Sequence, residues 1–130
     1  MRAARQVNDH KPRVVLDKIR KAASGFASPV IACLGLTFKA DIDDLRESPA
    51  LAIVSELAAA GVGRLLVVEP NVDALPPAIA NRHDVALTDM GEAIAKADVV
   101  VFLVNHKSFS TIESEHLNGK LVVNACGWRQ

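Results

Sequence analysis

Residues 30–35 read Val-Ile-Ala-Cys-Leu-Gly, and this short run decides the fold class. It is continuously apolar, it is rich in β-branched residues, and it ends at a glycine. That pattern is typical of a strand buried on both faces of a parallel sheet. Similar runs follow at residues 65–68, 99–104 and 121–123, and residues 85–87 form a weaker fifth candidate.

Helical patterns separate these expected strands. Residues 49–60 and 90–96 predict helices, residues 110–116 predict a shorter one, and two prolines interrupt the pattern of residues 72–80. Strands that alternate with helices imply right-handed crossovers. We therefore expect an α/β fold, a Rossmann-like, doubly wound parallel sheet of about five strands.

A helical arm is expected before the sheet. Pro12 suits a first helical turn and Gly25 suits a helix end, while Val15 and Ile19 belong to one apolar face. Residues 24–29 form the expected boundary between this arm and the α/β body.

Composition narrows the possible functions. The chain has 130 residues, 50% of them hydrophobic, which is enough for one domain with its own core. Its 15 basic and 15 acidic residues balance, which argues against a nucleic-acid-binding module. No apolar run is long enough to span a membrane, and the N-terminus lacks the apolar core of a secretory signal. Two cysteines fit a reducing compartment, so we expect a soluble cytoplasmic domain.

Residues 35–49 form a long connection after the first strand, and it is the stretch to examine for ligand binding. Connections between a strand and a helix are usually two to six residues long, and ligands collect at the carboxyl ends of parallel strands. A dinucleotide fingerprint is absent, because no glycine lies between Gly35 and Gly61.

Two further interpretations of this connection concern its charges. Asp41 and Asp43 begin like a calcium loop, but Arg46 replaces the turn glycine and Ala52 the bidentate glutamate. We therefore expect no metal site. Lys39 and Arg46 predict an anion site near the next helix N-terminus. A solvated loop whose acids and bases pair with one another is an equal alternative.

The remaining reactive side chains predict no catalytic residue. Cys33 lies inside the first strand and is expected in the core. Cys126 has no base in its neighbourhood that would activate it as a nucleophile. His106 follows the fourth strand, at the ligand-facing end of the sheet. It either lines a ligand pocket there or is a surface residue without a function. Trp128 is expected to pack against the body of the domain.

Residues 35–39 (Gly-Leu-Thr-Phe-Lys) and 43–49 (Asp-Asp-Leu-Arg-Glu-Ser-Pro) closely resemble the signature of the C-terminal domain of the UDP-glucose/GDP-mannose dehydrogenase family. Its UDP-N-acetylmannosamine dehydrogenase branch is the nearest match. The resemblance extends over nearly the whole chain, through residues 7–12, 67–71, 103–106 and 122–124.

The resemblance implies an enzymatic context. Enzymes of this family oxidise the C6 alcohol of a nucleotide sugar to a carboxylate, using two NAD⁺ and a covalent thiohemiacetal on a cysteine. Residues 1–24 would be the end of the central helical dimerisation domain, and residues 25–130 the nucleotide-sugar (UDP)-binding domain. The NAD-binding domain and the catalytic-cysteine motif look absent, so the chain is expected to bind its UDP-sugar without turning it over. The full-length enzyme is expected to be a homo-oligomer.

The resemblance also assigns site residues. It places Lys39 against the nucleotide sugar with Phe38 beside it, and Arg46 against the NAD of the same active site. One departure concerns Cys126, which stands where the family usually has a basic residue before a glycine. Either Arg129 supplies that charge, or this contact to the substrate is weaker or absent.

A non-enzymatic role in assembly is the alternative. Family members are oligomers, and a leading helix without its central domain would expose Val15 and Ile19. The domain would then act by oligomerisation rather than by ligand binding.

Overall fold

The structure, a computed structural model, describes residues 12–41 and 44–128. One parallel sheet has the strand order β3-β2-β1-β4-β5. The strands are β1 (Val30–Leu34), β2 (Arg64–Val68), β3 (Val85–Leu87), β4 (Val99–Phe102) and β5 (Leu121–Asn124). The helices are α2 (Pro12–Ala23), α3 (Pro49–Ala60), α4 (Pro77–Ala80) and α5 (Met90–Lys96), with the 3₁₀ turns η1 (Lys107–Thr111) and η2 (Ser114–Leu117). The predicted doubly wound, Rossmann-like α/β fold is confirmed.

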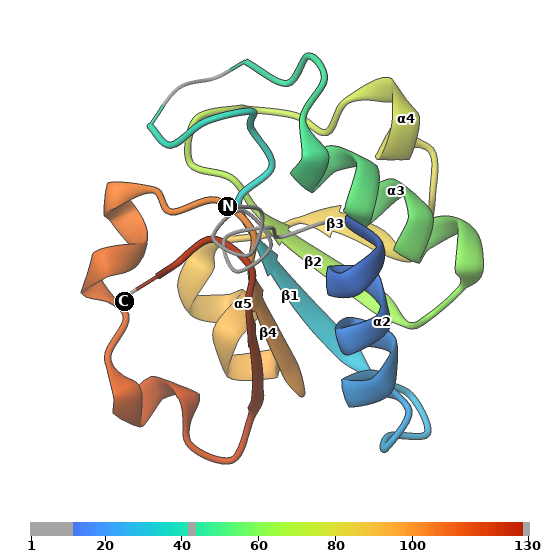
Figure 1. Cartoon of the computed structure of the whole chain (residues 1–130), viewed down its shortest axis with the longest axis vertical. Coiled ribbons are helices and arrows are strands. Elements are labelled where there is room, and N and C mark those ends of the chain that lie inside the picture. Colours follow the sequence, from blue (N-terminus) through green and yellow to red (C-terminus); the bar gives the residue numbers. More distant parts are fainter. Residues whose placement is uncertain (1–11, 42–43, 129–130) are drawn as a thin grey trace, which may run out of the picture.

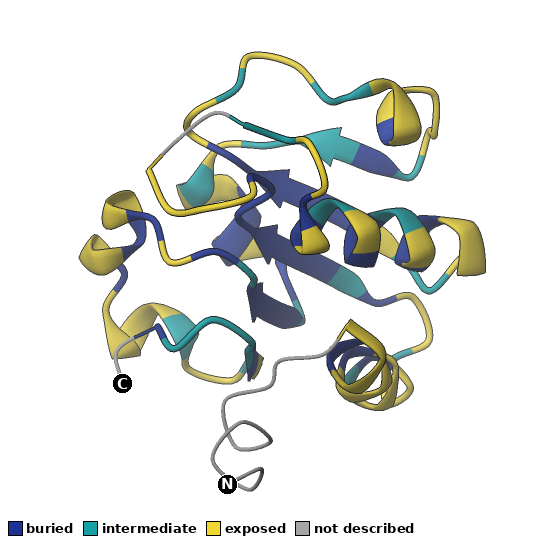
Figure 2. Cartoon of the chain, turned by 45° about the horizontal axis from the view of Figure 1, so that its top comes forward, coloured by how far each residue is buried: buried dark blue, intermediate teal, exposed yellow. Residues whose placement is uncertain are grey.

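The sheet is covered on both faces, as the continuous apolar runs predict. Ile31 and Cys33 of β1 point into the core shared with α2 and α3, whereas Ala32 and Leu34 point into the core shared with α5. Figure 1 shows the helices arranged around the sheet, and Figure 2 shows the buried strands between helices whose outer sides are exposed. Within the described part of the chain, no helix is long and apolar enough to cross a membrane.

The leading helix α2 is part of this core. Val15 and Ile19 are 3% and 0% exposed, because α2 packs against α3 and against β4 and β5. The expectation that these two side chains are exposed is therefore wrong. The part of the arm that precedes Pro12 lies outside the described residues.

The prediction of a helix at residues 110–116 is also wrong. The chain forms the two short turns η1 and η2 instead, separated by the extended backbone of Ile112 and Glu113. Ile112 is 2% exposed, so the extended backbone at this point accompanies the burial of its side chain. The Glu113 and His116 side chains then cap the new turn reciprocally.

The carboxyl ends of β1 and β4 lie side by side at the switch point of the sheet, where the strand order reverses. β4 ends at Phe102, two residues earlier than predicted, because the N–H groups of Leu103 and Val104 both donate to the Leu34 carbonyl. At the end of β1, Gly35 has a φ of 103°, and a Cβ there would lie 2.6 Å from that of Val104. Glycine is required by this close approach.

The C-terminal segment is anchored by its single tryptophan. The Trp128 ring stacks on Phe102 with centroids 4.0 Å apart, and its Nε1–H donates to the Phe109 carbonyl at 3.0 Å. The prediction that Trp128 packs against the body is confirmed.

Candidate functional site

Residues 35–48, here called the β1 loop, connect β1 to α3 at the switch point. The loop is closed near its ends by Ser48, whose Oγ donates to the Leu36 carbonyl at 2.7 Å. The same oxygen accepts the Leu51 N–H at 3.2 Å and so caps α3. Ser48 is 5% exposed, and it fixes both the helix start and the base of the loop.

A buried carboxylate lies beneath the start of this loop. Glu69 follows β2, and its side chain is fully buried. Its Oε1 accepts the N–H groups of Leu36 at 2.7 Å and Thr37 at 3.2 Å, while Oε2 accepts the backbone and side-chain N–H groups of Asn71. The backbone N–H groups of the first strand-to-helix turn receive phosphate in many Rossmann folds. In this chain, the corresponding N–H groups of Leu36 and Thr37 donate to the Glu69 carboxylate instead.

His106 joins this carboxylate to the middle of the β1 loop. It is 1% exposed, with Nε2 at 2.9 Å from Glu69 Oε1 and 3.3 Å from Thr37 Oγ1. Its Nδ1 accepts the Asp41 N–H at 2.7 Å, so the geometry assigns the ring proton to Nε2, which donates to Glu69. Asp41 Oδ1 in turn accepts the Lys107 N–H at 2.8 Å. We call Glu69 and His106, whose side chains are fully buried, the buried network; Asp41, whose side chain is 45% exposed, is bonded to it from the β1 loop.

The buried network keeps Glu69 ionised. Burial alone would raise the pKa of its carboxyl. The hydrogen bonds from His106 and from the N–H groups of Leu36 and Asn71 outweigh burial and lower the pKa. The interpretation of His106 as a surface residue is wrong, because its ring is buried at the ligand-facing edge of the sheet.

The three predicted site residues lie exposed on the β1 loop. Lys39 Nζ is 5.7 Å from the centroid of the Phe38 ring, within reach of a cation–π interaction. Arg46 pairs with Asp44 through Nε–Oδ1 at 3.1 Å and Nη2–Oδ2 at 3.2 Å, and the Arg46 hydrogen bonds lower the pKa of the Asp44 carboxyl. Over residues 12–41 and 44–128, no hydrogen bond joins Lys39 to Arg46 and no carboxylate pairs with Lys39. Arg46 thus fits the solvated-loop alternative, whereas Lys39 presents an ammonium group to solvent.

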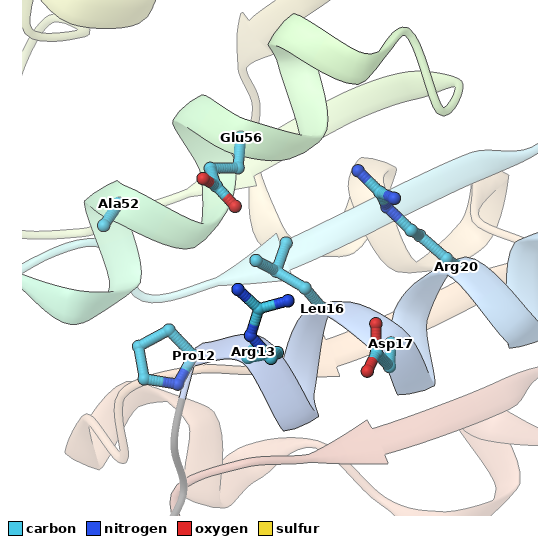
Figure 3. A pocket seen from close by; sticks show the side chains of 7 residues that line it. All are labelled: Pro12, Arg13, Leu16, Asp17, Arg20, Ala52 and Glu56. Atoms are coloured by element: carbon cyan, nitrogen blue, oxygen red, sulfur yellow. The ribbon is translucent and has the colours of Figure 1, made fainter.

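Several pockets lie away from these side chains. One of about 340 Å³ lies between α2 and α3, and Figure 3 shows the side chains of both helices around it. It is lined by Pro12, Arg13, Leu16, Asp17, Arg20, Ala52 and Glu56. Another, of about 450 Å³, lies at the carboxyl ends of β2 and β3 and has the carboxylates of Glu69 and Asp89 in its wall. The carboxylates of the second pocket disfavour an anion there, and the two arginines of the first pocket share its wall with Asp17 and Glu56, so the β1 loop remains the candidate anion site.

Neither cysteine has the surroundings of a reactive thiol. Burial raises the pKa of Cys33 to about 12, and it also raises the pKa of Cys126, which is half-buried after β5. Both shifts disfavour the thiolate. Arg129 and Asp43 lie outside the described residues. Within the part of the chain that the structure describes, no group of three or more His, Cys, Asp or Glu side chains could hold a metal ion.

Sequence reasoning assigned no role to Glu69, Asp41 or Thr37. A signal for Glu69 existed, since it directly follows the apolar run of β2 and therefore lies at the same sheet edge as the end of β1. Its partners Leu36, Thr37 and His106 are 32 to 37 residues away in the chain, so no local spacing could identify them.

Comparison with known proteins agrees with this architecture. Residues 32–127 match the UDP-glucose/GDP-mannose dehydrogenase family, UDP binding domain. The chain is 46% identical over 127 residues to an NDP-N-acetyl-D-galactosaminuronic acid dehydrogenase from Ralstonia nicotianae, covering 98% of the chain and 29% of the relative. It is 49% identical over 115 residues to a UDP-N-acetyl-D-mannosamine dehydrogenase from Campylobacter jejuni, covering 88% of the chain and 28% of the relative.

Solved structures share the fold. A UDP-glucose dehydrogenase from Pyrobaculum islandicum superposes with a TM-score of 0.71 at 24% identity, covering 95% of the chain and 28% of that protein. A GDP-mannose dehydrogenase from Pseudomonas aeruginosa superposes with a TM-score of 0.68 at 25% identity, covering 86% of the chain and 28% of that protein. The chain spans less than a third of the length of the curated relatives named above. By its match to the family and its identity to these relatives, the chain belongs to the UDP-glucose/GDP-mannose dehydrogenase family and corresponds to its UDP binding domain.

Proposed function

We propose that this chain is the nucleotide-sugar-binding part of an NAD-dependent UDP-sugar 6-dehydrogenase. The reaction would be of the UDP-N-acetylmannosamine type, which oxidises a C6 alcohol to a carboxylate with two NAD⁺. The identity of 49% to a relative bearing that name supports this choice. Residues 25–130 would form the binding domain, and residues 1–24 would connect it to a central helical domain.

The observation that carries the proposal is the presentation of Phe38 and Lys39. Both side chains are exposed on a loop that is tied to the switch point by Ser48, Glu69 and His106. A diphosphate concentrates negative charge, and the Lys39 ammonium group, which pairs with no carboxylate among the described residues, meets it as a point charge. Phe38 is 46% exposed and offers an aromatic face beside that charge.

NAD does not fit the chain's own strand-to-helix turn. The N–H groups of Leu36 and Thr37 already donate to Glu69, and the second and third glycines of a dinucleotide fingerprint are absent. This turn is therefore not proposed as an NAD site. Arg46, 89% exposed on the β1 loop, is proposed to contact NAD held elsewhere in the full-length enzyme.

The chain by itself is proposed to bind without catalysis. We assign no catalytic residue to it, since burial raises the pKa of both cysteines. The complete enzyme is proposed to be a cytoplasmic homo-oligomer whose NAD-binding and central domains act together with this one.

Calorimetric titration with UDP tests the binding proposal. The parent chain is expected to bind UDP, and Lys39→Ala is expected to weaken binding about tenfold, the effect of losing one charge-assisted contact. Lys18→Ala removes the same charge from the exposed side of α2 and serves as the matched control. A parent that does not bind, or a Lys39→Ala variant that binds as well as the Lys18→Ala control, would show that the site is wrong.

An enzyme assay tests the proposal that the chain by itself does not catalyse the reaction. NAD reduction with UDP-N-acetylmannosamine is expected to show no turnover by this chain alone. Measurable turnover that purifies with the chain would overturn the assignment of a purely binding role.

An assembly role is the second candidate, and one observation favours it. Leu121 and Val122 are 46% and 43% exposed on the edge strand β5, where they could meet a second copy of the chain. Sedimentation velocity over a range of concentrations decides this. Dimers that dissociate in Val122→Lys would support assembly through β5, and a monomer at every concentration would exclude it.

A further inference from the structure

We infer that His106 is a positioning residue for nucleotide binding. From its buried place after β4, it holds the segment of the β1 loop that carries Phe38 and Lys39. The expected effect on binding rests on the proposed function, whereas the effect on the loop itself does not.

The segment is attached on both sides to groups outside the loop. On one side the Thr37 N–H donates to Glu69 Oε1 at 3.2 Å, and on the other the Asp41 N–H donates to His106 Nδ1 at 2.7 Å. Residues 38–40 lie between these attachments. Because His106 Nε2 also donates to Glu69 at 2.9 Å, one imidazole ring links the two.

The backbone of Asp41 explains why an attachment is needed. Its φ is 61°, a left-handed conformation that a residue with a Cβ adopts only at a cost. The hydrogen bond to His106 opposes release of that conformation, as does the bond from the Lys107 N–H to Asp41 Oδ1. Without them, bonds within the loop itself, from the Thr37 hydroxyl to the Lys39 carbonyl and from the Phe38 N–H to the Asp44 carbonyl, are left to hold the segment that presents Lys39.

A loop that leaves its binding conformation lowers affinity without losing any contact to the ligand. The apparent dissociation constant rises as the fraction of competent molecules falls. His106 is buried and has no access to the nucleotide, so its influence on binding acts through the position of Phe38 and Lys39.

Two substitutions separate this role from a contribution to stability alone. In His106→Asn the amide oxygen takes the place of Nδ1 and accepts the Asp41 N–H, but the bond to Glu69 is lost. In His106→Gln the amide reaches the place of Nε2 and keeps Glu69, but leaves Asp41 without an acceptor. Both remove the ring, so both are expected to lower the free energy of unfolding to a similar degree.

The binding measurement is calorimetry with UDP on folded protein. His106→Gln is expected to weaken binding about three- to tenfold, the effect of losing one hydrogen bond, and His106→Asn to weaken it less than about twofold. Equal losses in the two variants would overturn the inference, because a purely structural role does not distinguish them.

Amide hydrogen exchange of the ligand-free protein gives a readout without UDP. The Asp41 amide is expected to exchange slowly in the parent and in His106→Asn, and faster in His106→Gln. The Gly35 amide, which donates to the Val68 carbonyl at 2.9 Å, is the internal control and is expected to stay unchanged relative to the parent. Equal protection of Asp41 in the two variants would overturn the positioning role. A parent that fails to bind UDP would overturn the proposed function, and exchange would still decide the role of His106.

Discussion

Replacing Glu69 by alanine removes the acceptor on which the β1 loop rests. Its carboxylate accepts the N–H groups of Leu36, Thr37 and Asn71, the Asn71 amide and His106 Nε2–H at distances of 2.7 to 3.2 Å. The alanine side chain accepts none of these, so buried donors are left without a partner. We expect a large loss of stability from this single substitution.

The magnitude follows from the number of donors. Each buried donor without a partner costs about 1–3 kcal/mol, and entry of water or a small shift of the loop recovers part of the total. The Glu69→Ala variant is therefore expected to lose about 3–5 kcal/mol of unfolding free energy, the sum of several such donors less the part recovered. Glu69→Gln keeps one acceptor oxygen but sets an NH₂ group against a donor, and is expected to lose about 1–3 kcal/mol.

The effect has a defined pH dependence. The pKa of Glu69 is lowered in the folded protein from its usual value of 4.5. The stability that this shift contributes is fully present above that value and is lost as the pH falls through the lowered folded-state pKa. Glutamine does not titrate. The difference in unfolding free energy between the parent and Glu69→Gln is therefore constant near neutral pH and narrows below about pH 4.5.

Urea unfolding followed by the fluorescence of the single tryptophan measures both effects. Series at pH 7 and at several values down to about pH 3.5 give the difference between the variants. Glu92→Gln is the control, because that carboxylate is half exposed on α5 and pairs only with Lys96 among the described residues. A difference that stays constant over the whole pH range, or an alanine variant that loses less than about 1 kcal/mol, would refute the reasoning.

Three further predictions concern the packing around the site. Trp128→Ala is expected to lower the unfolding free energy by about 3–5 kcal/mol, measured by urea and circular dichroism, and a loss under about 1 kcal/mol would contradict the described packing. Gly35→Ala is expected to lower the thermal midpoint far more than Gly61→Ala, because a Cβ clashes at the first position and meets open space at the second; equal midpoints would refute this. Cys33, with its pKa raised to about 12, is expected to react with a thiol reagent at pH 8 only after unfolding, and half-buried Cys126 more slowly than a free thiol; immediate reaction of both would contradict their burial.

The central strands β1, β2 and β4 could be predicted because they are buried on both faces. Burial on both faces makes a strand an unbroken apolar run, which is visible in the sequence as residues 30–34 and 65–68. The ends of the strands could be predicted less accurately. Leu103 and Val104 are as apolar as β4, but both donate their N–H groups to the Leu34 carbonyl and lie beyond the end of the strand. The helix expected at residues 110–116 failed because burying Ile112 requires extended backbone in its middle.

The candidate site could be predicted only as far as its exposed charges. Lys39 and Arg46 stand out in a long connection, and the structure places both on the β1 loop. Whether a charge has a partner depends on backbone geometry, which directs Arg46 onto Asp44. The buried network is invisible to any local pattern, because Glu69 and His106 come from different strands and meet only after the sheet has formed.

The bond between Ser48 and the Leu36 carbonyl makes the β1 loop a replaceable module. Residues 37–47 leave and re-enter the domain at two points held together by one hydrogen bond, and the start of α3 is capped by the same hydroxyl. A different sequence that keeps the N–H groups of residues 37 and 41 on Glu69 and His106 can stand between these points without changing the path of β1 or α3. In terms of evolution, the scaffold is separated from the surface that selects the ligand, so new ligand preferences can arise while the sheet stays as it is.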